Sequence, residues 1–237
     1  MFEIGAIPEC VPLPIGEFIM GETKHDKFST DTERPAHRVD FAEPFALGRF
    51  PVTIAQFRLI FPNHAIDEDP SLPVVNVSWD DAAAYCDALA ARTGKPFRLP
   101  SEAEWEFACR AGSRGAFSTG SEIKSDQANF LYSESGDKIG RGARSMIGEF
   151  PANAFGLYDL HGNVCEWVAD VWHPDYRSAP CDGSAWIDGA DYDIRVIRGG
   201  GWDYLPRLLR SAWRDGLPRF AHRDNLGFRV AYTLALT

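Results

Sequence analysis

Two stretches of the chain carry residues that could do chemistry. In the first, GLYDLHGNVCEW at 156–167, Asp159 and Glu166 lie seven residues apart around a His-Gly-Asn turn. Carboxylates brought together by a turn, with carbonyls exposed between them, supply the oxygen ligands that Ca²⁺ prefers. Spacing alone favours a structural role instead, in which Asp159 holds the turn and Glu166 pairs with an arginine. His161 has no second His or Cys at ligand spacing, so the motif does not indicate a transition metal.

The second stretch covers residues 195–231 and is basic and aromatic. It holds eight of the chain's 24 Lys and Arg residues, all arginine, and three acids. Its formal charge is therefore +5, within a chain of net charge −10. Trp202, Tyr204 and Trp213 run through it. This contrast indicates a folded, functional surface rather than a solvated run of charges.

Short helices must position these two stretches. Three times a Ser or Thr is followed three residues later by Gln, Asp or Glu, which is the capping box that opens a helix. The predicted helices cover residues 53–61, 78–94 and 101–112. The predicted apolar face of the second, at helical spacing, comprises Trp79, Ala82, Ala83, Cys86, Leu89 and Ala90.

Alternating apolar residues predict the strands. We expect a first strand over 13–21, a hairpin over 37–50 that turns at Glu43-Pro44, a strand over 194–198 and a last strand over 227–236. Regular patterning is absent from 113–153. The 16 prolines and 21 glycines are spread along all 237 residues. This distribution favours a single loop-rich domain over 1–237.

Composition also limits compartment and partners. The first residues have no basic start and prolines interrupt their apolar run, so we expect no signal peptide. No apolar stretch approaches the ~18–20 residues that span a membrane. We therefore expect a cytoplasmic protein without membrane contact, and the acidic net charge disfavours nucleic acid as a partner. Five scattered cysteines without a C-x-x-C pair are expected to be free thiols: Cys10, Cys86, Cys109, Cys165 and Cys181.

Three long motifs resemble the formylglycine-generating enzyme family, also called sulfatase-modifying factors. They are RLPSEAEWEFACRAG at 98–112, FGLYDLHGNVCEWVAD at 155–170 and the 195–231 stretch, in this order. The segments IGEFIMGE, ERPAHRV and FPVTIAQF resemble the family's opening, so the resemblance covers about residues 13–233. It implies an α+β, C-type-lectin-like fold that is irregular, low in regular secondary structure and has both termini in one small sheet.

The resemblance implies structural Ca²⁺. In the family, positions matching Asp159 and Glu166 give side-chain oxygens to calcium, and positions matching Gly162 and Val164 give backbone carbonyls. Here all four positions are suitably filled. A second calcium site of the family would map onto Asn129, Phe130, Asp137 and Ile139.

The family's copper chemistry does not map onto this sequence. Family enzymes oxidise a peptide cysteine to formylglycine on copper held by two cysteines, because thiolates suit Cu(I). The corresponding segment here, GGGWDYLPRLLRSAWR, has no cysteine. Gly201 stands in place of the family's active-site serine, and Cys165 stands in place of a tryptophan. The sequence therefore disfavours copper as a cofactor.

Two functional hypotheses remain open. The 195–231 stretch also resembles the C-terminal region of variable proteins of diversity-generating retroelements, in the Arg-Gly-Gly-x-Trp opening, the Arg-x-Ala-x-Arg centre and the Gly-Phe-Arg close. This resemblance implies a binding module that uses a 203–223 surface for a protein, peptide or small-molecule ligand, since aromatics and arginines suit such faces. Its candidate residues, with Asn225 from the enzyme family's substrate groove, are Trp202, Asp203, Tyr204, Arg207, Trp213, Phe220, His222 and Asn225.

The second hypothesis is a diverged oxidoreductase of the same family that acts on a peptide cysteine or a small metabolite without the copper pair. Its candidate acid/base groups are His222, Asp203 and Asp224. Under both hypotheses four arginines are expected to be structural and to pair with buried acids: Arg198, Arg210, Arg214 and Arg229.

Overall fold

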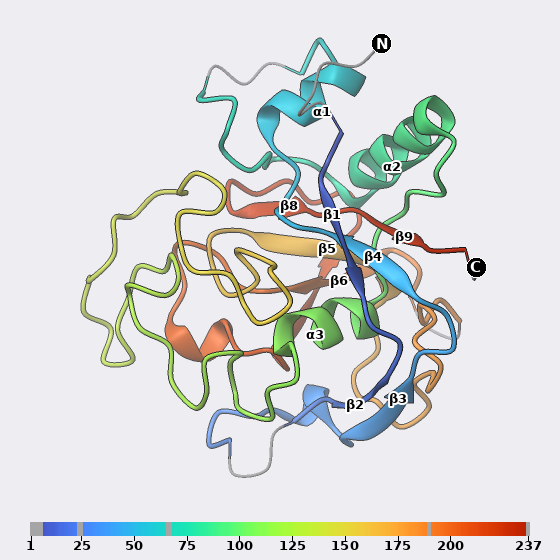
Figure 1. The fold of residues 1–237 in the computed structure, drawn as a ribbon. Coiled ribbons are helices and arrows are strands. Elements are labelled where there is room, and N and C mark those ends of the chain that lie inside the picture. The colour runs from blue at the N-terminus through green and yellow to red at the C-terminus, as the bar shows by residue number, and fades with distance from the viewer. Residues whose placement is uncertain (1–6, 23–25, 65–67, 189–190, 236–237) are drawn as a thin grey trace.

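The computed structural model describes residues 7–22, 26–64, 68–188 and 191–235. Its regular elements are short and are separated by long irregular segments (Figure 1). The α-helices are α1 (Ile54–Ile60), α2 (Trp79–Thr93) and α3 (Glu102–Arg110), and the 3-10 turns are η1 (Asp31–Glu33) and η2 (Pro206–Leu208). The strands are β1 (Cys10–Leu13), β2 (Glu17–Met20), β3 (His37–Asp40), β4 (Phe45–Gly48), β5 (Cys165–Val171), β6 (Ile194–Arg198), β7 (Arg214–Pro218), β8 (Leu226–Phe228) and β9 (Ala231–Thr233). The α+β class with little regular structure is thus confirmed.

All three predicted capping boxes open a helix. Thr53, Ser78 and Ser101 each accept a hydrogen bond from the backbone N–H three residues later, and the side chain at that position accepts in return from the cap's own N–H. The helix α2 ends as predicted at Gly94, which adopts the left-handed conformation that glycine tolerates. Its buried face also includes Tyr85, which the sequence pattern missed.

Three sheets organise the strands. The largest has the order β7-β6-β5-β8, and β8 pairs with β5 in parallel, with Leu226 beside Cys165. A second sheet, β1-β4-β9, brings strands from near both chain ends together, as the fold hypothesis expected. The third is the pair β2-β3. Figure 1 shows α3 between the β5 and β6 strands of the largest sheet and the β2-β3 pair, and every residue of α3 is buried.

Three strand predictions need correction. The 37–50 segment is not a hairpin, because β3 pairs with β2 whereas β4 pairs with β1 and β9. The predicted 13–21 strand is only partly formed: Leu13 ends β1, residues 14–16 are irregular, and β2 covers Glu17–Met20. The last strand is divided into β8 and β9 at Arg229, whose side chain turns into the interior to meet Glu166.

No helix in the described part of the chain combines the length and the apolar character needed to cross a membrane.

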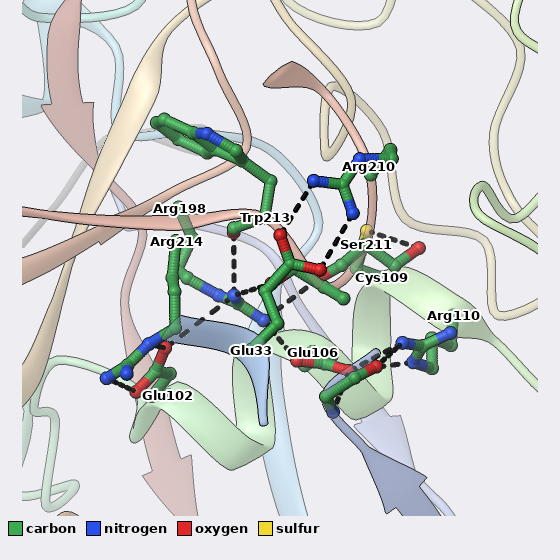
Figure 2. A network of polar contacts seen from close by, with 12 residues as sticks. Glu33, Glu102, Glu106, Cys109, Arg110, Arg198, Arg210, Ser211, Trp213 and Arg214 are labelled. Atoms are coloured by element: carbon green, nitrogen blue, oxygen red, sulfur yellow. Dashed lines mark hydrogen bonds and ion pairs between the residues drawn. The ribbon is translucent and has the colours of Figure 1, made fainter. Parts of the chain in front are cut away.

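Buried ion pairs join the C-terminal stretch to α3 and to the N-terminal segment (Figure 2). Arg198 is fully buried, bonds to Glu106 and donates to the carbonyl oxygen of Trp213 at 2.6 Å. Arg214 donates to both carboxylate oxygens of Glu102 at 2.7 and 2.8 Å. Burial opposes ionisation of Glu102, but Arg214 and Arg198 outweigh it and lower its pKa. The expected structural role of these arginines is confirmed.

The network makes a prediction about stability. Replacing Glu106 by Ala removes the carboxylate that is hydrogen-bonded to buried Arg198 and leaves this arginine with Glu102, whose Oε1 lies 3.6 Å away. We expect a cost of about 3–5 kcal/mol in the free energy of unfolding. Urea denaturation measures this loss. The matched control is Glu17→Ala, which removes the exposed partner of Arg38 and should cost less than about 1 kcal/mol. Equal losses for the two variants would contradict a supporting role for the buried network.

Candidate functional site

The candidate surface begins where β6 ends. Gly199 and Gly200 have positive φ angles of 91° and 73°, and Gly201 follows at the position of the family's serine. A Cβ atom at Gly201 would lie 2.7 Å from Asp203 Oδ1 and 3.0 Å from Asn225 Nδ2. A serine therefore does not fit here unless the Asp203–Asn225 pair moves.

Asp203 and Asn225 form a side-chain hydrogen bond across the candidate surface. The amide Nδ2 of Asn225 donates to Asp203 Oδ1 at 2.8 Å, so the structure brings together two residues predicted from different resemblances. Asn225 is buried, whereas Asp203 is half-buried. The indole N–H of Trp202 lies 3.4 Å from the carbonyl oxygen of Asp224. These contacts join residues 202–203 to residues 224–225 and so define one edge of the surface, here called the rim.

Beneath this rim lie an aromatic pair and one thiol. Tyr204 packs edge-on against buried Trp213, with ring centroids 5.7 Å apart. The Tyr204 side chain also meets Cys165, which is fully buried. Burial raises the pKa of both the Cys165 thiol and the Tyr204 phenol, so both groups are neutral at physiological pH. A buried neutral thiol is a poor metal ligand and a poor nucleophile.

The exposed part of the surface holds aromatic and basic side chains. Phe220 is 66% exposed, and His222 is exposed beside Asp81, with Nε2 and Oδ2 3.5 Å apart. Arg223 is exposed; its backbone oxygen accepts from Asn76 N at 2.9 Å, whereas its guanidinium makes no hydrogen bond or ion pair with the described residues. His222 therefore contacts α2 rather than Asp203 or Asp224, so the three proposed acid/base groups do not form one hydrogen-bonded set.

Segments far apart in sequence complete the surface at Arg207. Its backbone N–H donates to Glu134 Oε1 at 2.6 Å, and its guanidinium lies over the ring of Phe28, 5.7 Å from the centroid. Sequence reasoning missed Glu134 and Phe28, because both lie in irregular segments without a motif. Figure 1 shows the η2 turn beside the loops of the 113–153 segment.

A buried arginine supports the η2 turn from behind. Arg210 Nε donates to the carbonyl oxygen of Arg207 at 2.8 Å. Its other nitrogens donate to both oxygens of Glu33 and to Asp26 Oδ2, at 2.6 to 2.9 Å. The backbone of the candidate surface is therefore attached to the N-terminal segment through one guanidinium.

The predicted first calcium site offers oxygen atoms that could be ligands of Ca²⁺. Asp159 is buried, and desolvation raises the pKa of its carboxyl to about 6, while its Oδ2 accepts from Gly148 N. The carbonyl oxygens of Gly162 and Val164 accept no hydrogen bond from the described residues. Buried oxygen atoms that accept no hydrogen bond are suitable ligands for a hard cation. Glu166 differs, since both of its oxygens accept from Arg229.

The two halves of the predicted second calcium site, 129–130 and 137–139, lie on adjacent backbone segments, because Ile139 N donates to Leu131 O at 2.8 Å. Asn129 is buried, and its amide donates to Ala143 O at 2.9 Å and to Asn163 Oδ1 at 3.2 Å. Asp137 lies in an exposed turn and accepts from Ser135 at 2.7 Å. Phe130 is buried and Ile139 is half exposed. No hydrogen bond of the described residues joins Asn129 to Asp137.

A second polar group lies around buried His161, behind the η2 turn. Its Nδ1 lies 2.8 Å from Leu209 O, and its Nε2 accepts from Ser118 N at 3.0 Å. Burial lowers the pKa of His161 to about 4, so the ring is neutral and fixed as one tautomer. The described residues contain no group of three or more His, Cys, Asp and Glu side chains that could hold a metal, and all five cysteines are free.

Comparisons with known proteins agree with this architecture. Residues 3–234 match the family described as sulfatase-modifying factor enzyme 1-like domain. The inactive C-alpha-formylglycine-generating enzyme 2 of Mus musculus is 32% identical in an alignment of 287 positions that covers 94% of this chain and 85% of that protein. The structure of PvdO from Pseudomonas aeruginosa superposes with a TM-score of 0.87 at 35% identity and covers 98% of this chain and 96% of the other.

The variable protein 1 of Treponema denticola shares the fold, with a TM-score of 0.76 at 22% identity and coverage of 94% of both chains. These similarities confirm the irregular fold of the formylglycine-generating, C-type-lectin-like type. The match of nearly the whole chain leads to one conclusion: the chain belongs to the sulfatase-modifying factor (formylglycine-generating enzyme-like) family.

Proposed function

We propose that this chain is a binding module that uses the 203–223 surface to hold a peptide, protein or small-molecule ligand. One observation carries the proposal: a half-exposed aromatic and arginine surface is fixed to the buried ion-pair network. Arg210 and the Asp203–Asn225 pair hold its backbone, so little conformational entropy is lost when a ligand binds. Exposed Phe220 and Arg223 supply contact area and charge at its edge.

The chemistry of the site favours binding over copper-dependent oxidation. The thiol that meets this surface, Cys165, is buried and neutral, and the family's cysteine pair is absent from the sequence. A relative similar over nearly its whole length carries the name "inactive", which supports a non-catalytic role for this chain too. The alternative, a diverged oxidoreductase, is supported by the Asp203–Asn225 pair, a polar group at the place of the family's active site.

Ligand binding at this surface can be tested with peptides selected from a random display library on the immobilised protein. Replacing Phe220 by Ala should weaken a selected peptide about tenfold, because a bound peptide would bury this large exposed aromatic side chain. Isothermal titration calorimetry measures the change. The control Ile19→Ala removes an equally exposed apolar side chain from β2 and should leave affinity unchanged. Selected peptides that respond to Ile19→Ala and not to Phe220→Ala would contradict the proposal.

The oxidase alternative makes the opposite prediction about copper. We expect no stoichiometric Cu(I) binding in anaerobic titration with a chromogenic chelator, because one buried thiol cannot supply the two soft ligands. Mass spectrometry of a cysteine-containing peptide should show no conversion to formylglycine. Stoichiometric Cu(I) together with that conversion would establish the enzyme in place of the binding module.

We also propose that Ca²⁺ binds at Asp159 and the carbonyl oxygens of Gly162 and Val164, with Glu166 shared between the cation and Arg229. The ion would neutralise a carboxylate that burial otherwise disfavours and would connect the 159–166 turn to β5.

Chelation with EGTA should therefore lower the melting temperature by several degrees, measured by scanning calorimetry. In the variant Asp159→Asn this dependence should be lost. Asp137→Asn, at the exposed turn, should retain it. An identical melting temperature with and without EGTA in the unmodified protein would remove calcium from the proposal.

A further inference from the structure

The contacts of Glu134 identify a binding subsite within the candidate surface. Its carboxylate accepts from the backbone N–H of Arg207 at 2.6 Å, and its second oxygen lies 3.6 Å from the Arg207 guanidinium. A main-chain donor and an arginine that share one carboxylate form a recognisable carboxylate-binding arrangement. Phe28 adds an aromatic face on the guanidinium.

This contact differs from the structural ion pairs nearby. Arg210 and Glu33 are 2% and 0% exposed, so their separation would leave buried charges unpaired. The side chains of Arg207 and Glu134 are instead 43% and 37% exposed. Exposed ion pairs contribute little to stability. A ligand carboxylate that competes with Glu134 for Arg207 therefore has to overcome a preference for Glu134 of only about fivefold.

The segment that carries Glu134 can release it without losing its own structure. Residues 132–138 form a turn in which Ser133 N donates to Asp137 O at 2.8 Å, and Asp137 N donates to Ser133 Oγ at 3.1 Å. None of these bonds uses the Glu134 side chain. Tyr132 N donates to Tyr204 O, which keeps the base of the turn on the surface.

We infer that Glu134 is an internal stand-in for a carboxylate of the ligand, and that the ligand is an acidic peptide which displaces Glu134 from Arg207. This inference rests on the proposed binding function and names the ligand class for the same surface. The turn at 132–138 then acts as a competitor that excludes ligands without a carboxylate.

The test uses N-acetylated, amidated tetraglutamate as the probe and tetraglutamine as its neutral match. Nuclear magnetic resonance titration follows the backbone amide of Arg207 in the full chain. Glu134→Gln should tighten tetraglutamate binding about three- to fivefold, because the internal competitor is lost. Arg207→Gln should weaken it about fivefold, and tetraglutamine should not bind in either case.

The matched control is Glu149→Gln. Glu149 is an exposed carboxylate of the same 113–153 segment and pairs with Arg141, so this variant changes net charge equally without touching Arg207. Its affinity should stay within twofold of the unmodified protein. Equal tightening by Glu149→Gln would assign the gain to overall charge and overturn the inference, as would binding that ignores Arg207→Gln.

Failure of the inference can be told apart from failure of the proposed function. If library-selected peptides still depend on Phe220 while tetraglutamate binding ignores Glu134 and Arg207, only the carboxylate subsite is wrong. If neither kind of peptide binds at the 203–223 surface, both proposals fail.

Discussion

The architecture depends on buried arginine side chains, most of which form ion pairs with buried carboxylates. Five arginines of the C-terminal stretch are at least 96% buried. Four of them meet a carboxylate from another part of the chain. The fifth, Arg195, lies over the rings of Trp79 and Tyr192 instead. Because an unpaired buried charge costs several kcal/mol, those pairings fix which distant segments lie together. Glu33 reaches Arg210 across 177 residues, and Glu166 reaches Arg229 across 63. Irregular loops without a ladder of backbone hydrogen bonds are therefore held by guanidinium groups.

This arrangement explains how so little regular structure supports a defined surface. Each buried guanidinium bonds carbonyl oxygens as well as carboxylates, as when Arg198 bonds Ala212 O and Trp213 O. Those carbonyls belong to the loop between η2 and β7, so the arginine satisfies backbone groups that would otherwise be buried without donors. Residues 202–208 of the candidate surface lie directly outside these buried guanidinium groups, which hold their backbone in place.

Features set by neighbouring residues could be predicted from the sequence, whereas features set by distant partners could not. The capping boxes at Thr53, Ser78 and Ser101 operate over three residues, and all three helices were predicted. Strand pairing is decided by partners elsewhere, so β3 and β4 were wrongly paired with each other. The same limit applies to the site. Asp203 and Asn225 carried motif signals, but Glu134 is linked to Arg207 only through the fold.

The buried ion-pair network and the candidate surface use different residues, so the function of the surface can change without loss of the fold. Among the described residues, no buried ion pair involves a residue of the 201–208 loop. Substitution in that loop therefore leaves the network intact, and the fold does not depend on which side chains the loop carries. Since function resides in sites built on a fold rather than in the fold itself, a binding face can occupy the place of an active site. Cys165, enclosed beneath Tyr204, then serves packing, as a small apolar side chain.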